Sequence, residues 1–418
     1  MTQRPFATNP PVAAQRKAAT GTPDSARAWV MTAAAFIVGF VVFGVLYSFG
    51  VFLSAIVEDF HASRAAASAL FSATGLGFYL AGPATGHLGD RFGPRVMAAA
   101  GAVLMGGGLA LTACIGQLWV GYLTYGLAVG VGASCAYIPT LALIGGWFVR
   151  QRQAALGVAA AGTGVGTLAV PPLAAALIEH YGWRVTDVIL GLGCFLLLAG
   201  CAAMVRPSPL TGGAEGRKLR QVIGSPSFLM LYACWALGTT ALFVPFVYLP
   251  AFARELGASQ VAASALLSLL GGMGLIGRLG TGTLGNRIGM VRLFRACVLI
   301  MGASNLLWLT LPTYGGLILF VVVLGLAYGA RIALMPGVLI EFFGLQNLGV
   351  ILGAFFTGSG IASILGPMLA GVIVDRTGSY HWGIVFALAA GLLAFLTIVP
   401  LRHKAAAHRN AAHGQAAR

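Results

Sequence analysis

Charged residues are scarce in this sequence. They make up 8% of the 418 residues, whereas 58% are hydrophobic and the mean hydropathy is +0.89. A soluble domain carries about 25% charged residues, so this chain could not cover a water-facing surface. That shortage excludes a cytosolic enzyme, a secreted domain and a disordered protein. The composition instead predicts a polytopic α-helical membrane protein.

Acidic residues are the scarcer of the two signs, with 10 Asp and Glu against 25 Lys and Arg. All ten lie in a loop, in a tail or near the end of an apolar run, so no carboxylate is expected at mid-membrane depth. The net charge of +15 would suggest nucleic-acid binding in a soluble chain. Here the basic residues cluster in short gaps between apolar runs, where they set membrane orientation. We therefore expect no nucleic-acid partner.

Metal-binding and catalytic clusters are also lacking. The six cysteines lie inside apolar segments without metal-ligand spacing, and no pair among His61, His87, His180 and His381 has ligand spacing. An intramembrane enzyme would need a nucleophile with a base, or a metal cluster. The sequence therefore predicts no catalytic residues, no metal ligands and no cofactor.

What the chain does have is twelve apolar runs of about 20 residues, the length that crosses a bilayer. We place these spans at roughly 29–56, 65–87, 95–114, 118–146, 154–178, 186–204, 228–252, 262–282, 294–312, 315–339, 349–374 and 382–401. The glycines of the fifth span, among them Gly162 and Gly166, are predicted to pack closely against a neighbouring helix.

Basic residues in the loops predict the orientation. With the N-terminus inside, the inner segments hold 19 Lys and Arg and the outer segments hold four, which predicts two cytoplasmic termini. Compact loops indicate a bacterial inner (plasma) membrane. We expect five parts, of which the first is a disordered tail and not a signal peptide: tail 1–27, six-helix half 28–204, cytoplasmic linker 205–227, six-helix half 228–402 and tail 403–418.

A short motif occurs twice, once in each half. Gly86-His-Leu-Gly-Asp90-Arg91-Phe-Gly93-Pro-Arg95 follows the second span, and Gly282-Thr-Leu-Gly-Asn286-Arg287-Ile-Gly289-Met-Val-Arg292 follows the eighth. The offset between Gly86 and Gly282 is 196 residues, about half the chain. Repeated six-span halves are typical of transporters, whose substrate site lies between the halves near the bilayer midplane.

The first copy resembles the loop signature of the major facilitator superfamily. A narrower resemblance, to the monocarboxylate transporter family and its bacterial oxalate/formate relatives, rests on Tyr137-Ile-Pro139-Thr140, on Gly146–Gly157, on Gly162–Gly166 and on Gly182-Trp183-Arg184. The resemblance implies an all-α membrane fold of twelve transmembrane helices in two six-helix pseudo-repeat halves. It also implies a gating motif in which Asp90 meets the N-terminus of the eleventh span; the motif residues are Gly86, Asp90, Arg91, Gly93, Arg95 and Arg287.

Two arginines lie well within spans, Arg278 in the eighth and Arg331 in the tenth. A mid-bilayer arginine is costly and normally faces a cavity or a partner. The family resemblance implies that Arg278 binds the substrate carboxylate, because a guanidinium can donate two parallel hydrogen bonds to it. Arg331 is open to two interpretations: a second substrate cation, or a structural residue that pairs with Glu341 or with backbone carbonyls.

The chain also departs from the animal monocarboxylate transporters. They carry an aspartate one turn before the span-eight arginine, where this chain has Gly274, and a lysine in the first span, where it has Tyr47. These departures leave the proton carrier unassigned. The candidate aromatic residues that line the substrate site are Tyr47, Tyr125, Tyr137, Tyr328 and Phe355.

The sequence therefore predicts a secondary active transporter of small, lactate- or pyruvate-like monocarboxylates, working as a proton-coupled symporter by alternating access. Its expected partners are a small organic anion, a proton and the lipid bilayer, and its oligomeric state is open. The first alternative is an exchanger of organic anions or dicarboxylates that uses both Arg278 and Arg331. A drug exporter, a channel and an intramembrane enzyme are less favoured alternatives.

Overall fold

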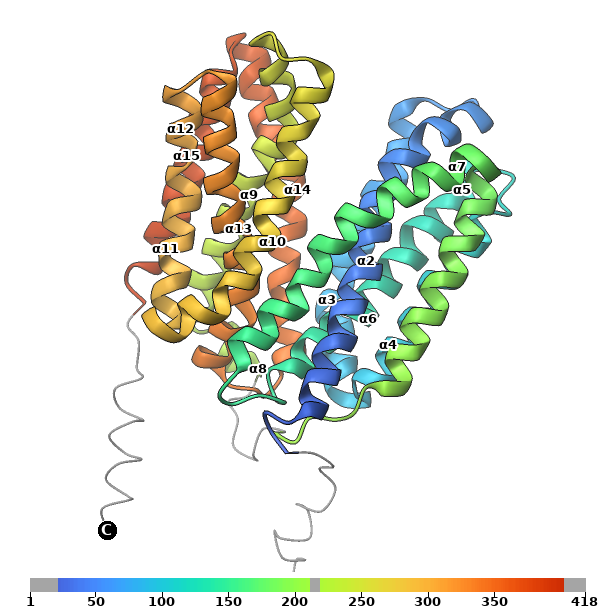
Figure 1. Cartoon of the computed structure of the whole chain (residues 1–418), viewed down its shortest axis with the longest axis vertical. Coiled ribbons are helices and arrows are strands. Elements are labelled where there is room, and N and C mark those ends of the chain that lie inside the picture. Colours follow the sequence, from blue (N-terminus) through green and yellow to red (C-terminus); the bar gives the residue numbers. More distant parts are fainter. Residues whose placement is uncertain (1–21, 211–218, 402–418) are drawn as a thin grey trace, which may run out of the picture. The chain divides into compact units, whose positions relative to one another are not determined.

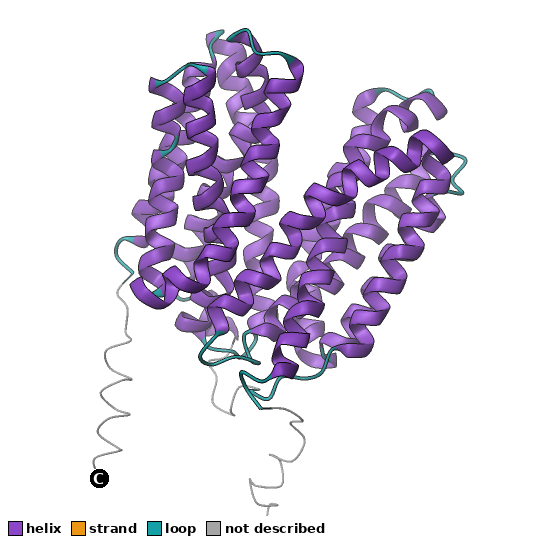
Figure 2. Cartoon of the chain, viewed as in Figure 1, coloured by secondary structure: helices purple, strands orange, loops and turns teal. Residues whose placement is uncertain are grey.

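The computed structural model describes residues 22–210 and 219–401, which form helices joined by short connections, without a strand among them (Figure 2). Apolar segments form helices in lipid because a helix satisfies every backbone hydrogen bond within the segment. Serines mark several helix starts: the side chains of Ser25, Ser63, Ser225 and Ser259 each accept a hydrogen bond from the amide three residues further on.

The described residues divide into two compact units, coloured blue to green and yellow to red in Figure 1. The first comprises residues 22–210 together with 344–350. Its helices are α2 (Ala26–Asp59), α3 (Arg64–Phe92), α4 (Pro94–Thr112), α5 (Leu118–Gly121), the π-helix η2 (Tyr122–Val129), α6 (Gly130–Ile144) and α7 (Arg152–Met204).

The second unit comprises residues 219–343 and 351–401. Its helices are α8 (Leu219–Ile223), α9 (Pro226–Glu255), α10 (Gln260–Ile288), α11 (Met290–Ala303), α12 (Asn305–Thr310), α13 (Tyr314–Phe343), α14 (Leu348–Thr377) and α15 (Tyr380–Ile398). The first three residues of α14 belong to the first unit. The division into five parts that the sequence suggests stays a prediction, and most of both tails lies outside the described residues.

Ten helical stretches of the described chain are long and apolar enough to cross a membrane. One of them, α7, is 53 residues long and contains the non-helical residue Gly182, so it consists of two consecutive helices. The second expected span corresponds to α3, which is 29 residues long and is not among these ten stretches. The structure thus has a helix for each of the twelve expected spans, and the number that crosses the membrane stays a prediction.

Glycines bring the helices of each unit close together. A Cβ at Gly162 or Gly166 of α7 would collide with the backbone of Phe36 or Phe40 on α2, which confirms the close packing predicted for these glycines. In the second unit a Cβ at Gly277 of α10 would meet the Leu326 carbonyl of α13. The close approach of α10 to α13 determines the geometry of the site described below.

The repeated motif has the same backbone geometry in both copies. Gly93 has φ 89° and ψ 155° between α3 and α4, and Gly289 has φ 91° and ψ 139° between α10 and α11. Each glycine amide donates to the carbonyl four residues earlier, of Gly89 and Gly285 respectively. Because residues with a side chain rarely adopt this positive φ, the two glycines are required for the turn that the motif makes.

Candidate anion-binding site

Arg278 on α10 is a buried cation without a counter-ion in the described part of the chain. Its side chain is 5% exposed, and its Nε atom has no hydrogen-bond partner. The one ion pair among the described residues joins Arg184 and Asp59. Burying an unpaired charge costs several kcal/mol or more. The arrangement therefore suits an arginine that receives its partner from outside the chain.

The aromatic neighbour of Arg278 is Tyr328 on α13. The guanidinium carbon lies 5.6 Å from the centre of the Tyr328 ring, a distance at which a cation is attracted to the ring face. Tyr328 in turn packs edge-on against Phe246 of α9, with 6.2 Å between the ring centres. A ring on one side of the guanidinium leaves its in-plane N–H groups able to donate to an anion.

Glycines allow this pairing of α10 and α13. A Cβ at Gly329 would collide with the carbonyl of Gly274, so the two helices touch through backbone atoms just beside Tyr328. A Cβ at Gly274 itself would lie 3.5 Å from the Tyr328 ring, in ordinary van der Waals contact. Small residues at these positions thus place the ring of one helix against the arginine of the other.

Arg331, one turn after Tyr328, is in a different environment. It is 1% exposed and donates to the Trp235 carbonyl at 2.7 Å and to the Cys234 carbonyl at 3.5 Å. It also donates to Thr239 Oγ1 at 3.5 Å, and its guanidinium stacks 4.2 Å from the Trp235 ring centre. Of the alternatives considered for Arg331, the contacts with backbone carbonyls are the ones present in this structure.

The other candidate aromatic residues occupy three kinds of position. Tyr47 is 40% exposed and stacks on Phe43. Tyr125, Tyr137 and Phe355 are buried in the packed interiors of their units, against Phe49, Phe43 and Phe228 respectively. The structure therefore brings Tyr328 alone of these residues into contact with Arg278 within one unit, and the substrate-lining roles of the rest stay predictions.

The gating motif contacts the first turn of α14, inside the first unit. The Val350 amide donates to the Asp90 carboxylate at 3.3 Å, and a Cβ at Gly86 would collide with the Gly349 carbonyl. Desolvation raises the pKa of the Asp90 carboxyl, an effect that hydrogen bonds from the Val350 and Gly349 amides and the nearby His87 partly offset. The side chains of Arg91, Arg95 and Arg287 are exposed. The predicted contact between Asp90 and this helix N-terminus is thus present, and its gating role stays a prediction.

Comparison with known proteins identifies the family. The family model of the Major Facilitator Superfamily matches residues 35–313 and 281–417. Monocarboxylate transporter 13 of Bos taurus is 31% identical over 388 residues, which cover 91% of this chain and 91% of that protein. Monocarboxylate transporter 3 of Rattus norvegicus is 31% identical over 386 residues, 88% of this chain and 78% of that one. The chain belongs to the monocarboxylate transporter family of this superfamily.

A solved structure confirms the fold of this family member. The proton:xylose symporter XylE, bound to 6-bromo-6-deoxy-D-glucose, superposes with a TM-score of 0.73. The match covers 90% of this chain and 96% of the symporter at 16% sequence identity. The expected all-α fold of the major facilitator superfamily is therefore confirmed, and the chain is a multi-pass membrane protein.

Asp24 has a structural role that sequence reasoning missed in this monocarboxylate transporter family member, because the residue falls within the predicted tail 1–27. Its carboxylate accepts hydrogen bonds of 3.1–3.3 Å from the amides of Val149, Arg150 and Gln151, just before α7. Slight burial would raise the pKa of Asp24, but these three amides lower it overall. Asp24 thereby ties the start of α2 to the start of α7.

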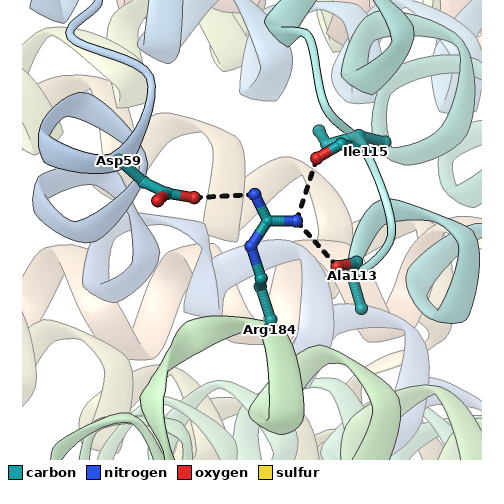
Figure 3. Close-up of polar contacts among 4 residues, drawn as sticks. All are labelled: Asp59, Ala113, Ile115 and Arg184. Atoms are coloured by element: carbon teal, nitrogen blue, oxygen red, sulfur yellow. Dashed lines mark hydrogen bonds and ion pairs between the residues drawn. The ribbon is translucent and has the colours of Figure 1, made fainter.

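Arg184 joins several segments of the first unit, as Figure 3 shows. It forms an ion pair with Asp59 at 2.8 Å and donates to the carbonyls of Ala113 and Ile115 at 2.8 and 2.9 Å. Gly182, with φ 77°, permits the break in α7 that places Arg184 at the start of its second helix. The Gly-Trp-Arg segment that carried part of the family resemblance is thus a structural junction.

Asp187 lies near the end of an expected span, as the sequence predicts, but it is buried. It follows the break at Gly182 by five residues, yet its side chain is 1% exposed and its Oδ1 accepts no hydrogen bond. Among the residues that the structure describes, it is the one acidic side chain in the buried class. Its position near a span end gave no signal of this burial, which depends on the packing of α7 against its neighbours.

Proposed function

We propose that this chain transports small monocarboxylates of the lactate and pyruvate type across the membrane, with Arg278 as the group that binds the substrate carboxylate. The names of its relatives support the substrate class, since proteins 31% identical to it are called monocarboxylate transporters. The position of Arg278 supports the site.

The observation that carries the proposal is the buried, unpaired guanidinium of Arg278. A carboxylate would offset its charge and accept two parallel hydrogen bonds from the planar guanidinium. The Tyr328 ring restricts access of water to one face of this pair, which strengthens the interaction. A neutral or cationic substrate would leave the charge of Arg278 uncompensated.

The contacts of Arg331 favour a monoanion over a dicarboxylate. Three acceptors on α9 engage one terminal nitrogen, Nη2, of its guanidinium, and its side chain is 1% exposed. A dicarboxylate that used Arg331 would have to reach this buried side chain, and turning the guanidinium away from α9 would cost about 1.5–3 kcal/mol for each hydrogen bond broken. With Arg278 as the available cation, a single carboxylate balances the site.

We further propose that a proton accompanies the substrate and that transport follows alternating access. The carrier of that proton is unassigned, because Gly274 and Tyr47 occupy the positions of the aspartate and lysine found in animal relatives. The positive-inside charge bias supports a location in the cell's plasma membrane with both termini cytoplasmic. The five-part division of the chain belongs to the same proposal.

Binding of a small ligand panel tests the proposal. The purified protein and its Arg278→Gln variant are heated with lactate, pyruvate, acetate, succinate or a lipophilic cation, and the melting temperature is recorded. We expect stabilisation by monocarboxylates that disappears in the variant, because glutamine cannot supply the charge. Arg254→Gln, a change at an exposed arginine outside the gating motif, is the matched control and should respond as the unaltered protein does.

Two outcomes would contradict the proposal. Stabilisation by succinate alone would favour the dicarboxylate exchanger, and stabilisation by the cation alone would exclude an anion site. Uptake into liposomes with and without an imposed pH gradient then tests proton coupling separately. If the rate of lactate transport does not change with the gradient, transport is not coupled to protons, and the proposal for the substrate is unaffected.

A further inference from the structure

We propose that Arg331 is a positioning residue, which holds α13 against α9 so that Tyr328 stays over Arg278. Arg331 would thus set the affinity for the substrate without touching it. This inference rests on the proposed function for its transport readout, and it also has a readout that needs no substrate.

The first support is the way in which α9 surrounds the guanidinium. Through Nη2, Arg331 donates to the Trp235 and Cys234 carbonyls and to Thr239 Oγ1, so residues from two adjacent turns of α9 bind it. The Trp235 ring covers one face at 4.2 Å. Since a charged hydrogen bond is stronger and more directional than a neutral one, this single side chain fixes the position of α13 relative to α9.

A glycine on α9 makes room for the arginine. A Cβ at Gly238 would lie 3.0 Å from one terminal nitrogen of Arg331 and 3.1 Å from its guanidinium carbon. Both distances are tighter than ordinary carbon contacts, so any larger residue would displace the guanidinium. Gly238 and Arg331 therefore form a matched pair across the two helices.

The same tryptophan extends the connection to a third helix. Trp235 Nε1 donates to Ser359 Oγ of α14 at 2.7 Å, and both side chains are buried. Arg331 on α13, Trp235 on α9 and Ser359 on α14 are thus linked by short polar contacts. These buried contacts restrict the movement of the three helices against one another, although the Nε atom of Arg331 has no hydrogen-bond partner.

The position of α13 decides where Tyr328 lies. Tyr328 precedes Arg331 by three residues, so the two side chains lie near one face of the helix. Between them, the backbone of Gly329 touches Gly274 on α10. Arg331 therefore secures α13 to α9 at the point where α13 also meets α10, which keeps Tyr328 within 5.6 Å of the Arg278 guanidinium.

A weak point in α13 makes such a connection necessary. Pro336 lies inside the helix, and a proline removes the hydrogen bond to the carbonyl four residues earlier, here that of Ile332. The helix is easily bent there, immediately after Arg331. Without the contact to α9, bending at this point would shift Tyr328 relative to Arg278.

The test compares the substrate dependence of uptake in four variants. Arg331→Met removes the charge and the hydrogen bonds. Arg331→Lys keeps the charge but lacks the planar guanidinium, and Gly238→Ala displaces the guanidinium while Arg331 itself is unchanged. Gly315→Ala, at an α13 glycine with open space around it, is the control. We expect KM for lactate and pyruvate to rise about tenfold in the methionine variant, as loss of charged hydrogen bonds implies, with kcat changed much less. The KM of Arg331→Lys and of Gly238→Ala should lie between those of the unaltered protein and Arg331→Met, and the KM of Gly315→Ala should be unchanged.

Two transport outcomes would overturn the inference. An unchanged KM combined with a lower melting temperature would show that Arg331 only stabilises the fold. A loss confined to succinate, with lactate and pyruvate unaffected, would make Arg331 a second substrate cation that contacts the ligand directly.

A double-mutant cycle without substrate separates this inference from the proposed function. Melting temperatures are measured for Arg331→Met, Tyr328→Ala and the double variant. If Arg331 positions Tyr328, the two effects couple and do not add; additive effects would overturn the inference. A protein that binds no monocarboxylate at all would refute the proposed function and leave the result of the cycle intact.

Discussion

The guanidinium of Arg278 faces the Tyr328 ring across the contact between α10 and α13, with 5.6 Å from its central carbon to the ring centre. This pairing depends on backbone contact between the two helices, since Gly274, Gly277, Gly325 and Gly329 all lie where a Cβ would meet the opposite helix. Helix α13 also carries the other buried arginine, Arg331, which contacts α9. Arg331 thus donates three hydrogen bonds to α9 through Nη2, whereas Arg278 has the Tyr328 ring as its neighbour. The Nε atom of each arginine has no hydrogen-bond partner.

The role of Tyr328 can be divided between its ring and its hydroxyl. Tyr328→Phe keeps a ring over Arg278 and should change the dissociation constant for lactate by no more than about threefold, because a cation–ring contact is worth about 0.5–2 kcal/mol for either residue. Tyr328→Ala removes the ring and should weaken binding by tenfold or so on the same scale. Isothermal titration or thermal shift with lactate measures both. Equal, large losses in the two variants would show that the hydroxyl contacts the substrate.

Gly274 offers a way to restore the charge pattern of the animal relatives. It precedes Arg278 by four residues, so a carboxylate in its place lies on the same helix face, and a Cβ there meets the Tyr328 ring only at 3.5 Å. In Gly274→Asp the new carboxylate should pair with Arg278 and compete with lactate at neutral pH. Protonating it at acidic pH would free the arginine, so affinity should increase as the pH falls. Gly274→Asn, which cannot titrate in this way, is the control, and the same pH response in both variants would contradict the prediction.

Much of the fold could be predicted from the sequence because the features that determine it are local. Apolar length predicted the helices, and the repeated motif around Asp90 and Asn286 predicted the superfamily. The state of the two intramembrane arginines could not be predicted, since Arg278 and Arg331 are chemically identical and both lie within apolar helices, of 29 and 30 residues. What distinguishes them is the alignment of α13 with its neighbours, in which Gly238 makes room for one arginine and Gly274 places a ring beside the other.

Asp24 was missed for a related reason. Its three partners, the amides of Val149, Arg150 and Gln151, lie more than 120 residues away in the chain, and backbone amides have no sequence signature. An aspartate just before a serine N-cap is a common local pattern with several uses. The packing of α2 against α7 is what brings the carboxylate to these amides.

The Asp24 contact predicts a pH-dependent contribution to stability. Asp24→Ala should lower the free energy of unfolding by about 1–2 kcal/mol, as loss of a capping side chain does. Because the amides lower the pKa of Asp24 below its ordinary value of 3.8, the stabilisation is fully present above that value and is lost as the pH falls through the folded-state pKa. The difference in melting temperature between the protein and the variant should therefore stay constant from neutral pH to about pH 4 and shrink below it. Glu179→Ala, at an exposed carboxylate, is the control. A melting-temperature difference for Asp24→Ala that already shrinks above pH 5 would contradict a lowered pKa of Asp24.

Gly86 tests the contact between the gating motif and α14. A methyl group at this position cannot fit, because it would collide with the carbonyl of Gly349, and overpacking of this kind costs about 1–3 kcal/mol. The first turn of α14 should move away from α3 in Gly86→Ala, and the hydrogen bond from the Val350 amide to Asp90 should break.

If this contact is a gate, lactate uptake into liposomes should fall while binding of lactate to the purified variant persists, since Arg278 lies in a different unit of the chain. Gly107→Ala adds the same methyl group to α4 in open space and should leave uptake unchanged. If Gly86→Ala loses both uptake and binding, Gly86 is needed for folding. If the variant retains both, the contact of Asp90 with α14 has no part in transport.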